Sequence, residues 1–160
     1  MVLPVQRVIG VRGDLGAELA FALKARGPGV DWILPSELDK DLQRSPALDA
    51  RTQDLPVDDF LIGEVQRIGD PLFGDLRRLG AVSNADFALL PVQAALEASQ
   101  GGGRGAVRLW AALIEVRTGR VLWFGIVEGD PGSKDDARPL ASAVDELART
   151  LLGAESGSGT

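Results

Sequence analysis

The side chains of this sequence best suited to chemistry are aspartates that come in close pairs. Two neighbouring carboxylates can act as general acid and general base, or can bind a hard cation. Each pair lies near an expected helix start or on an expected exposed face, where helix capping and solubility account for it. We therefore expect no catalytic residue among these pairs, which are Asp39/Asp41, Asp58/Asp59 and Asp135/Asp136.

The best candidate for a metal site is a single loop that carries four acidic residues, Glu128, Asp130, Asp135 and Asp136. Calcium-binding loops space their oxygen ligands in fixed patterns. The spacing of these four residues matches no such pattern, so we expect an empty loop and no metal.

A stretch rich in glycine, Gly10 to Gly16, lies between an expected strand and an expected helix, where a phosphate-binding loop would lie. Its glycine spacing differs from the dinucleotide fingerprint, and Asp14 places a carboxylate at the helix N-terminus, where the anion would bind. Asp31 precedes the second expected strand, whereas a ribose-binding acid follows it. The stretch therefore predicts a capped turn without a cofactor.

Composition excludes several further function classes. The 160 residues include no His, Cys or Tyr, which removes the Ser-His-Asp and Cys-His systems, the usual zinc sites and the commonest general base. The net charge is −6, and no dense run of Lys or Arg follows the chain, so nucleic-acid binding is not expected. No stretch reaches the roughly 18 apolar residues that a membrane span needs.

The segment most informative about the fold is 106–129, where two apolar runs flank Arg117-Thr118-Gly119-Arg120. Gly119 can take the positive φ that closes a tight hairpin with a bulge. With Val116 opposite Val121, both faces of the hairpin are apolar, so both need cover from helices or from another chain. One face carries Trp110, Ala112, Ile114, Val116, Val121, Trp123 and Val127, and the other carries Leu109, Ala111, Leu113, Leu122, Phe124 and Ile126.

The remaining chain predicts strands and helices around this hairpin. Apolar spacing and capping residues predict helices that begin at Asp14, Pro35, Asp58 or Asp59, Asp70 and Pro139. The third of these helices is expected to carry Leu61, Val65 and Ile68 inward and to form an elbow with the fourth. The other expected strands are 2–9, 30–34 and 87–96, with irregular chain at 45–56 and 130–138.

These elements predict an α/β fold of the α+β sandwich type. Its mixed sheet ends in a C-terminal antiparallel meander of three strands, with helices packed on it. We expect a single domain over residues 1–153 and a flexible tail over residues 154–160, whose composition is typical of a linker.

The residues 85–92, ADFALLPV, followed by 111–123, AALIEVRTGRVLW, resemble a pattern in bacterial cell-envelope lipoproteins. In that pattern an "ADY-VL" strand leads into a "D-TG-VLW" hairpin. The group includes the curli-secretion channel subunit, penicillin-binding-protein activator lipoproteins and uncharacterised outer-membrane lipoproteins. This sequence has Phe87 for the usual Tyr, Glu115 for the usual Asp and no lipid-attachment Cys.

The resemblance implies a non-enzymatic, exported protein that makes protein contacts or self-assembles. It also implies a periplasmic or outer-membrane-associated location, with a lipid anchor that could have been removed with a signal peptide. A cytoplasmic location is the alternative. The chain is expected to cross no membrane.

Two functions remain open. The first is a non-catalytic module that binds a protein partner or forms a homo-oligomer, with Trp110, Arg108 and Ile114 as partner-binding residues and Trp123 in the core. The second is a small-molecule or nucleotide-binding domain, enzymatic through its carboxylates. A deep cleft lined by Asp14, Glu128 and Asp130 would favour the second function.

Overall fold

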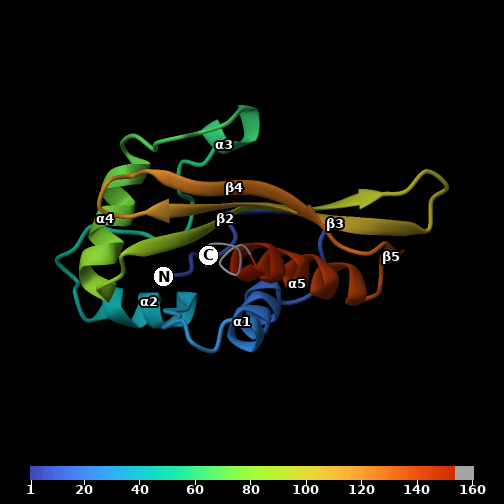
Figure 1. Ribbon diagram of the computed structural model, residues 1–160, viewed down its shortest axis with the longest axis horizontal. Helices are drawn as coiled ribbons and strands as arrows, with labels where there is room; N and C mark the ends of the chain where they lie inside the picture. The colour runs from blue at the N-terminus through green and yellow to red at the C-terminus, as the bar shows by residue number, and fades with distance from the viewer. Residues whose placement is uncertain (154–160) are drawn as a thin grey trace, which may run out of the picture. The chain divides into compact units, whose positions relative to one another are not determined.

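The computed structural model describes residues 1–153, so the expected tail at 154–160 lies outside the described residues. The described chain folds as α+β, with helices packed on an open mixed sheet of strand order β1-β2-β3-β4, and with β5 paired to β3 (Figure 1). This confirms the expected fold class. The elements are β1 (Arg7–Ile9), α1 (Leu15–Arg26), α2 (Pro35–Gln43), α3 (Asp59–Ile62), α4 (Leu72–Ser83), β2 (Phe87–Ala98), β3 (Arg104–Glu115), β4 (Val121–Glu128), β5 (Gly132–Ser133) and α5 (Arg138–Gly153).

The hairpin between β3 and β4 closes on Gly119, whose φ is 72°. The Glu115 carbonyl accepts a hydrogen bond from the Gly119 N–H, and the Glu115 N–H donates to the Arg120 carbonyl, both at 2.9 Å. Gly119 and Arg120 thus both face Glu115. This is a β-bulge with its glycine in the left-handed region. The predicted turn is confirmed, but Glu115 lies opposite Arg120, so the expected register of Val116 opposite Val121 is wrong.

The described chain forms two compact units, and β2, β3 and β4 each contribute one part to each unit. Unit 1 comprises Met1–Arg7, Ile33–Val92 and Trp110–Gly125. Unit 2 comprises Val8–Trp32, Gln93–Leu109 and the described residues from Ile126 onward. The expectation of one domain over residues 1–153 stays a prediction.

The core of unit 1 joins alternate residues of the strands to α2, α3 and α4. On β2 and β3 these are Ala88, Leu90, Val92, Ala112 and Ile114, which share one face because side chains alternate along a strand. The helices contribute Leu38, Phe60, Leu72, Leu76 and Leu79, all buried. The Phe60 ring lies 5.5 Å from that of Phe124 on β4.

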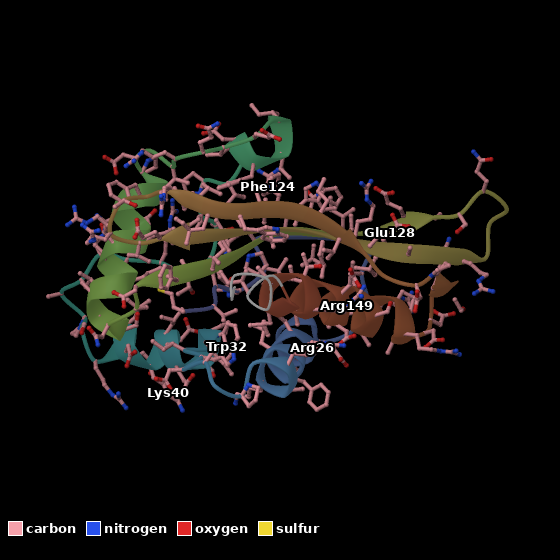
Figure 2. The ribbon with its side chains drawn as sticks, in the orientation of Figure 1. Arg26, Trp32, Lys40, Phe124, Glu128 and Arg149 are labelled. Atoms are coloured by element: carbon pink, nitrogen blue, oxygen red, sulfur yellow. The ribbon has the colours of Figure 1, made fainter. Side chains whose placement is uncertain are left out.

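In unit 2, α1 packs against α5. Asp14 caps α1 as predicted, since its carboxylate accepts a hydrogen bond of 2.9 Å from the Ala17 N–H. The Arg26 guanidinium binds both carboxylate oxygens of Asp145 on α5, at 2.6 and 2.7 Å, and this contact lowers the pKa of Asp145. Figure 2 labels Arg26 on α1.

Two expected strands are wrong or shortened. Residues 30–34 form no strand; the Ile33 carbonyl accepts one bond from the Val2 N–H, and Pro35 then begins α2. Within 2–9 only Arg7–Ile9 is a strand, although Val2 makes a parallel bridge with Leu89. Pro4 has no N–H to extend that pairing.

The third expected helix is wrong beyond its first turn. It ends at Ile62, and Gly63 is fully extended with φ 179°. The chain that follows runs beside the hairpin, where the Gln66 carbonyl accepts from Val121 N–H and the Ile68 N–H donates to Gly119, both at 2.9 Å. Val65 and Ile68 therefore lie outside any helix, and the expected elbow of two helices does not form.

One short strand, β5, arises in the loop expected to be irregular, and it pairs antiparallel with the start of β3. No helix in the described residues is long and apolar enough to cross a membrane.

Candidate functional site

Unit 2 presents a sheet face that carries charged and apolar side chains. Along β3, Val107 and Leu109 are buried, whereas Arg108 between them is partly exposed. Along β4, Val127 is buried between exposed Ile126 and Glu128. Because side chains alternate across a strand, each segment has one buried and one accessible side.

Arg108 is the centre of this accessible side. Its Nη1 donates to the Glu97 carboxylate on β2 at 2.9 Å, and its Nε lies 3.7 Å from the Glu128 carboxylate on β4. Figure 2 labels Glu128 near the end of β4. We call Glu97, Arg108 and Glu128 the charged row. Ile126, with 46% of its surface exposed, lies on β4 two residues before Glu128.

The sequence named Trp110, Arg108 and Ile114 as partner-binding residues. The structure places Arg108 in the charged row of unit 2. Trp110 is half-buried and packs against the core of unit 1. Ile114 is 0% exposed in that same core, so any effect of Ile114 on a partner would pass through its neighbours.

The tryptophan expected in the core is not among the fully buried residues. Trp123 is half-buried, and its ring lies over Gly125, where a Cβ would stand 2.4 Å from Cζ2. Only a glycine leaves room for the ring there. Trp32 is half-buried in unit 2, where its Nε1 donates to the Gly27 carbonyl at 2.9 Å (Figure 2).

Five of the six paired carboxylates make structural contacts with neighbouring side chains or backbone. Asp39 accepts from the Thr52 hydroxyl at 3.2 Å, and Asp41 lies 3.5 Å from Arg44. Asp58 forms an ion pair with Arg7. The remaining pair stabilises the loop before α5, since Asp135 binds Arg12 and Asp136 accepts from the backbone and side chain of Arg138.

The acidic residues of the loop between β4 and α5 do not come together as a metal site. The Arg138 backbone N–H is the main cause of the lowered pKa of Asp136. No group of three or more acidic residues in the described part of the chain has the geometry to hold a metal ion. An open depression of about 550 Å³ includes Asp130 in its lining, together with Arg104, Ser133 and Ser142. Asp14 and Glu128 lie outside this lining, so the three acids do not share this depression.

Sequence reasoning missed a group of arginines at the hairpin turn of unit 1. Arg67, which precedes α4, donates from Nη1 to the Thr118 carbonyl at 2.7 Å and lies opposite Arg120 in an antiparallel bridge. These residues are about 50 positions apart in the chain. No pattern along the sequence could therefore have identified the group.

Comparison with known proteins finds a solved structure of similar fold. No family model and no curated protein matches the chain. Among solved structures it is similar to the lipoprotein GNA1162 from Neisseria meningitidis, with 16% identity, a TM-score of 0.50, and coverage of 98% of this chain and 96% of that one. The expected lipoprotein-like fold is confirmed at this level, and the narrower lipoprotein group stays a prediction.

Two further structures show weaker similarity. One is the hypothetical protein CT253 from Chlamydia trachomatis, at 13% identity and TM-score 0.38, covering 98% of this chain and 94% of that one. The other is a PelC dodecamer from Paraburkholderia phytofirmans, at 15% identity and TM-score 0.36, covering 94% and 92%. Scores of this size do not establish a common fold.

Proposed function

We propose that this chain is a non-catalytic module of the bacterial cell envelope that binds a protein partner or a second copy of itself through its sheet. The observation that carries the proposal is the accessible side of the sheet in unit 2, where exposed Ile126 accompanies the charged row. An apolar side chain beside charges that are already paired suits a protein surface better than a substrate pocket. The fold shared with a lipoprotein supports the envelope location.

The proposal predicts no response to common small ligands. We expect the melting temperature to stay unchanged with ATP, NAD or Mg²⁺, because the chain has neither a phosphate loop nor a gathered acid cluster in its described part. A ligand present at about 100 times its dissociation constant would stabilise the fold by about 2.7 kcal/mol. Differential scanning fluorimetry measures such a shift, and a clear rise with any of the three would favour the small-molecule alternative.

Association of the chain with a partner or with a second copy should depend on residues of the strands. It should not depend on exposed apolar residues elsewhere. We expect Ile126→Lys to abolish or weaken association without unfolding the chain, since a buried ammonium opposes an apolar contact while an exposed one does not. We expect Trp110→Lys to weaken association too, with folding retained. Size-exclusion chromatography with light scattering reports the mass, and circular dichroism reports folding.

The matched control is Phe21→Lys on α1. Phe21 is 73% exposed, so this change removes an accessible aromatic from a helix and leaves the strands intact. Association lost equally in Phe21→Lys and Ile126→Lys would contradict a sheet interface. Unfolding of Trp110→Lys alone would show that Trp110 serves the core of unit 1.

A further inference from the structure

Four arginines of unit 1 gather at the hairpin turn, and we call Arg67, Arg77, Arg117 and Arg120 the turn arginines. Arg117 and Arg120 belong to the turn itself, and Arg67 contacts it through the Thr118 carbonyl. Arg77 on α4 lies 5.7 Å from the centre of the Phe73 ring. A Cβ at Gly119 would stand 3.0 Å from that ring, so Phe73 brings Arg77 to the same turn.

The turn arginines differ from most other arginines of the chain in lacking a carboxylate partner. Within the described residues, ion pairs engage Arg7, Arg12, Arg26, Arg44, Arg78, Arg108, Arg138 and Arg149, and none engages a turn arginine. All four are exposed. Positive charge without a direct ion-pair partner is thus concentrated at one turn of a chain whose net charge is −6.

An acidic side chain, Glu115, lies within the electrostatic field of the turn arginines. It accepts a hydrogen bond from the Thr118 hydroxyl. That bond is the largest cause of its lowered pKa, and the charges of Arg120, Arg117 and Arg67 lower it further. A single carboxylate already bonded to Thr118 leaves the guanidinium groups with an excess of positive charge.

This arrangement brings like charges together, and a bound anion would relieve their repulsion. Arg67 and Arg120 lie directly opposite each other in a bridge, and like charges in such positions destabilise a pair of strands. Each guanidinium presents a planar set of donors that matches a carboxylate in two-point contact. Carboxylates placed among the turn arginines would turn the repulsion into attraction.

We propose that the turn arginines form a binding surface for an acidic segment of a protein partner, whose carboxylates pair with Arg67, Arg117 and Arg120. This inference rests on the proposed protein-binding function and names the chemistry of one partner. A peptide fits better than an anionic membrane or a nucleic acid. Glu64, three residues before Arg67, and Asp59 on α3 are both exposed, and these carboxylates would repel an extended anionic surface but not a short segment.

The test uses a fluorescent hexaglutamate peptide and the double variant Arg117→Gln/Arg120→Gln of the full chain. We expect fluorescence anisotropy at low ionic strength to show binding to the unaltered protein, and about a tenfold weaker affinity for the variant. Added salt should weaken binding further. The melting temperature of the variant should be unchanged or higher, because the change relieves like-charge repulsion; a purely structural role would lower it.

The matched control is Arg51→Gln/Lys24→Gln, which removes the same charge elsewhere and should keep the affinity within about twofold. Equal peptide binding by both double variants and the unaltered protein would overturn the proposal. Tighter, arginine-dependent binding to vesicles of phosphatidylglycerol would overturn it in favour of a membrane surface. Association through Ile126 is measured separately by mass, so failure of one proposal is distinguishable from failure of the other.

Discussion

Replacing Ile114 with alanine is expected to lower the free energy of unfolding by about 2–5 kcal/mol. Ile114 is fully buried in the core of unit 1, together with residues of β2 and the helices α2 and α4. Alanine would remove three carbons there and leave a cavity that close-packed neighbours fill only in part. Urea denaturation followed by circular dichroism measures the change.

The matched control is Ile62→Ala, the same substitution on an isoleucine of α3 that has 85% of its surface exposed and lies outside the proposed interface. It should change stability by no more than about 0.5 kcal/mol. A loss of stability at Ile114 as small as that at the control position would contradict its burial. Ile114 would then be exposed and able to contact a partner directly.

Replacing Gly119 with valine is expected to destabilise the fold by about 1–3 kcal/mol. At φ 72° a β-branched residue is strained, and its Cβ would stand 3.0 Å from the Phe73 ring and 3.2 Å from both the side chain and the carbonyl of Ile68. Strain and crowding therefore act at the same turn. The denaturation midpoint reports the effect.

Gly103→Val is the control for this second prediction. Gly103 lies in the connection between β2 and β3, with no positive φ and no atom within 4 Å of an added Cβ. A loss of stability at Gly103 as large as at Gly119 would mean that valine in any connecting loop is harmful, and the special role of Gly119 would be lost.

Elements with a local cause could be predicted from the sequence. The glycine in Arg117-Thr118-Gly119-Arg120 fixes its turn through its own φ, and Asp14 caps α1 through an N–H three residues away. The last helix follows from Pro139 in its first turn and from the spacing of the buried Leu140, Val144 and Leu147. In each case the interaction lies within one segment, so neighbouring residues suffice to reveal it.

Elements that depend on distant pairing could not be predicted. The apolar spacing of Leu61, Val65 and Ile68 fits a helix, but hydrogen bonds to Gly119 and Val121 hold residues 66–68 beside the hairpin instead. The register of the hairpin was missed because the N–H of Val116 bonds to the Asp86 carbonyl. Tertiary pairing overrides local spacing in both cases.

The candidate site was only partly predictable. The sequence drew attention to Arg108 and Trp110 on the apolar hairpin, yet it could not show that Glu97 and Glu128 pair with Arg108 from neighbouring strands. The residues next to Ile114 in the sequence are like those next to an exposed strand residue, so the sequence could not show that Ile114 is buried. Its burial follows from the packing of α2 and α4 on the strands. The turn arginines come from stretches of chain that lie far apart in the sequence, so the sequence could not group them.

Sedimentation velocity of the fluorescently labelled chain, alone over a range of concentrations and in bacterial envelope extract, tests the binding module most directly. A monomer of 16.9 kDa sets the reference. The proposed function predicts a faster-sedimenting species that grows with protein concentration or appears in the extract, and that Ile126→Lys diminishes. Monomer alone at every concentration up to the high micromolar range, and in the extract, would contradict it.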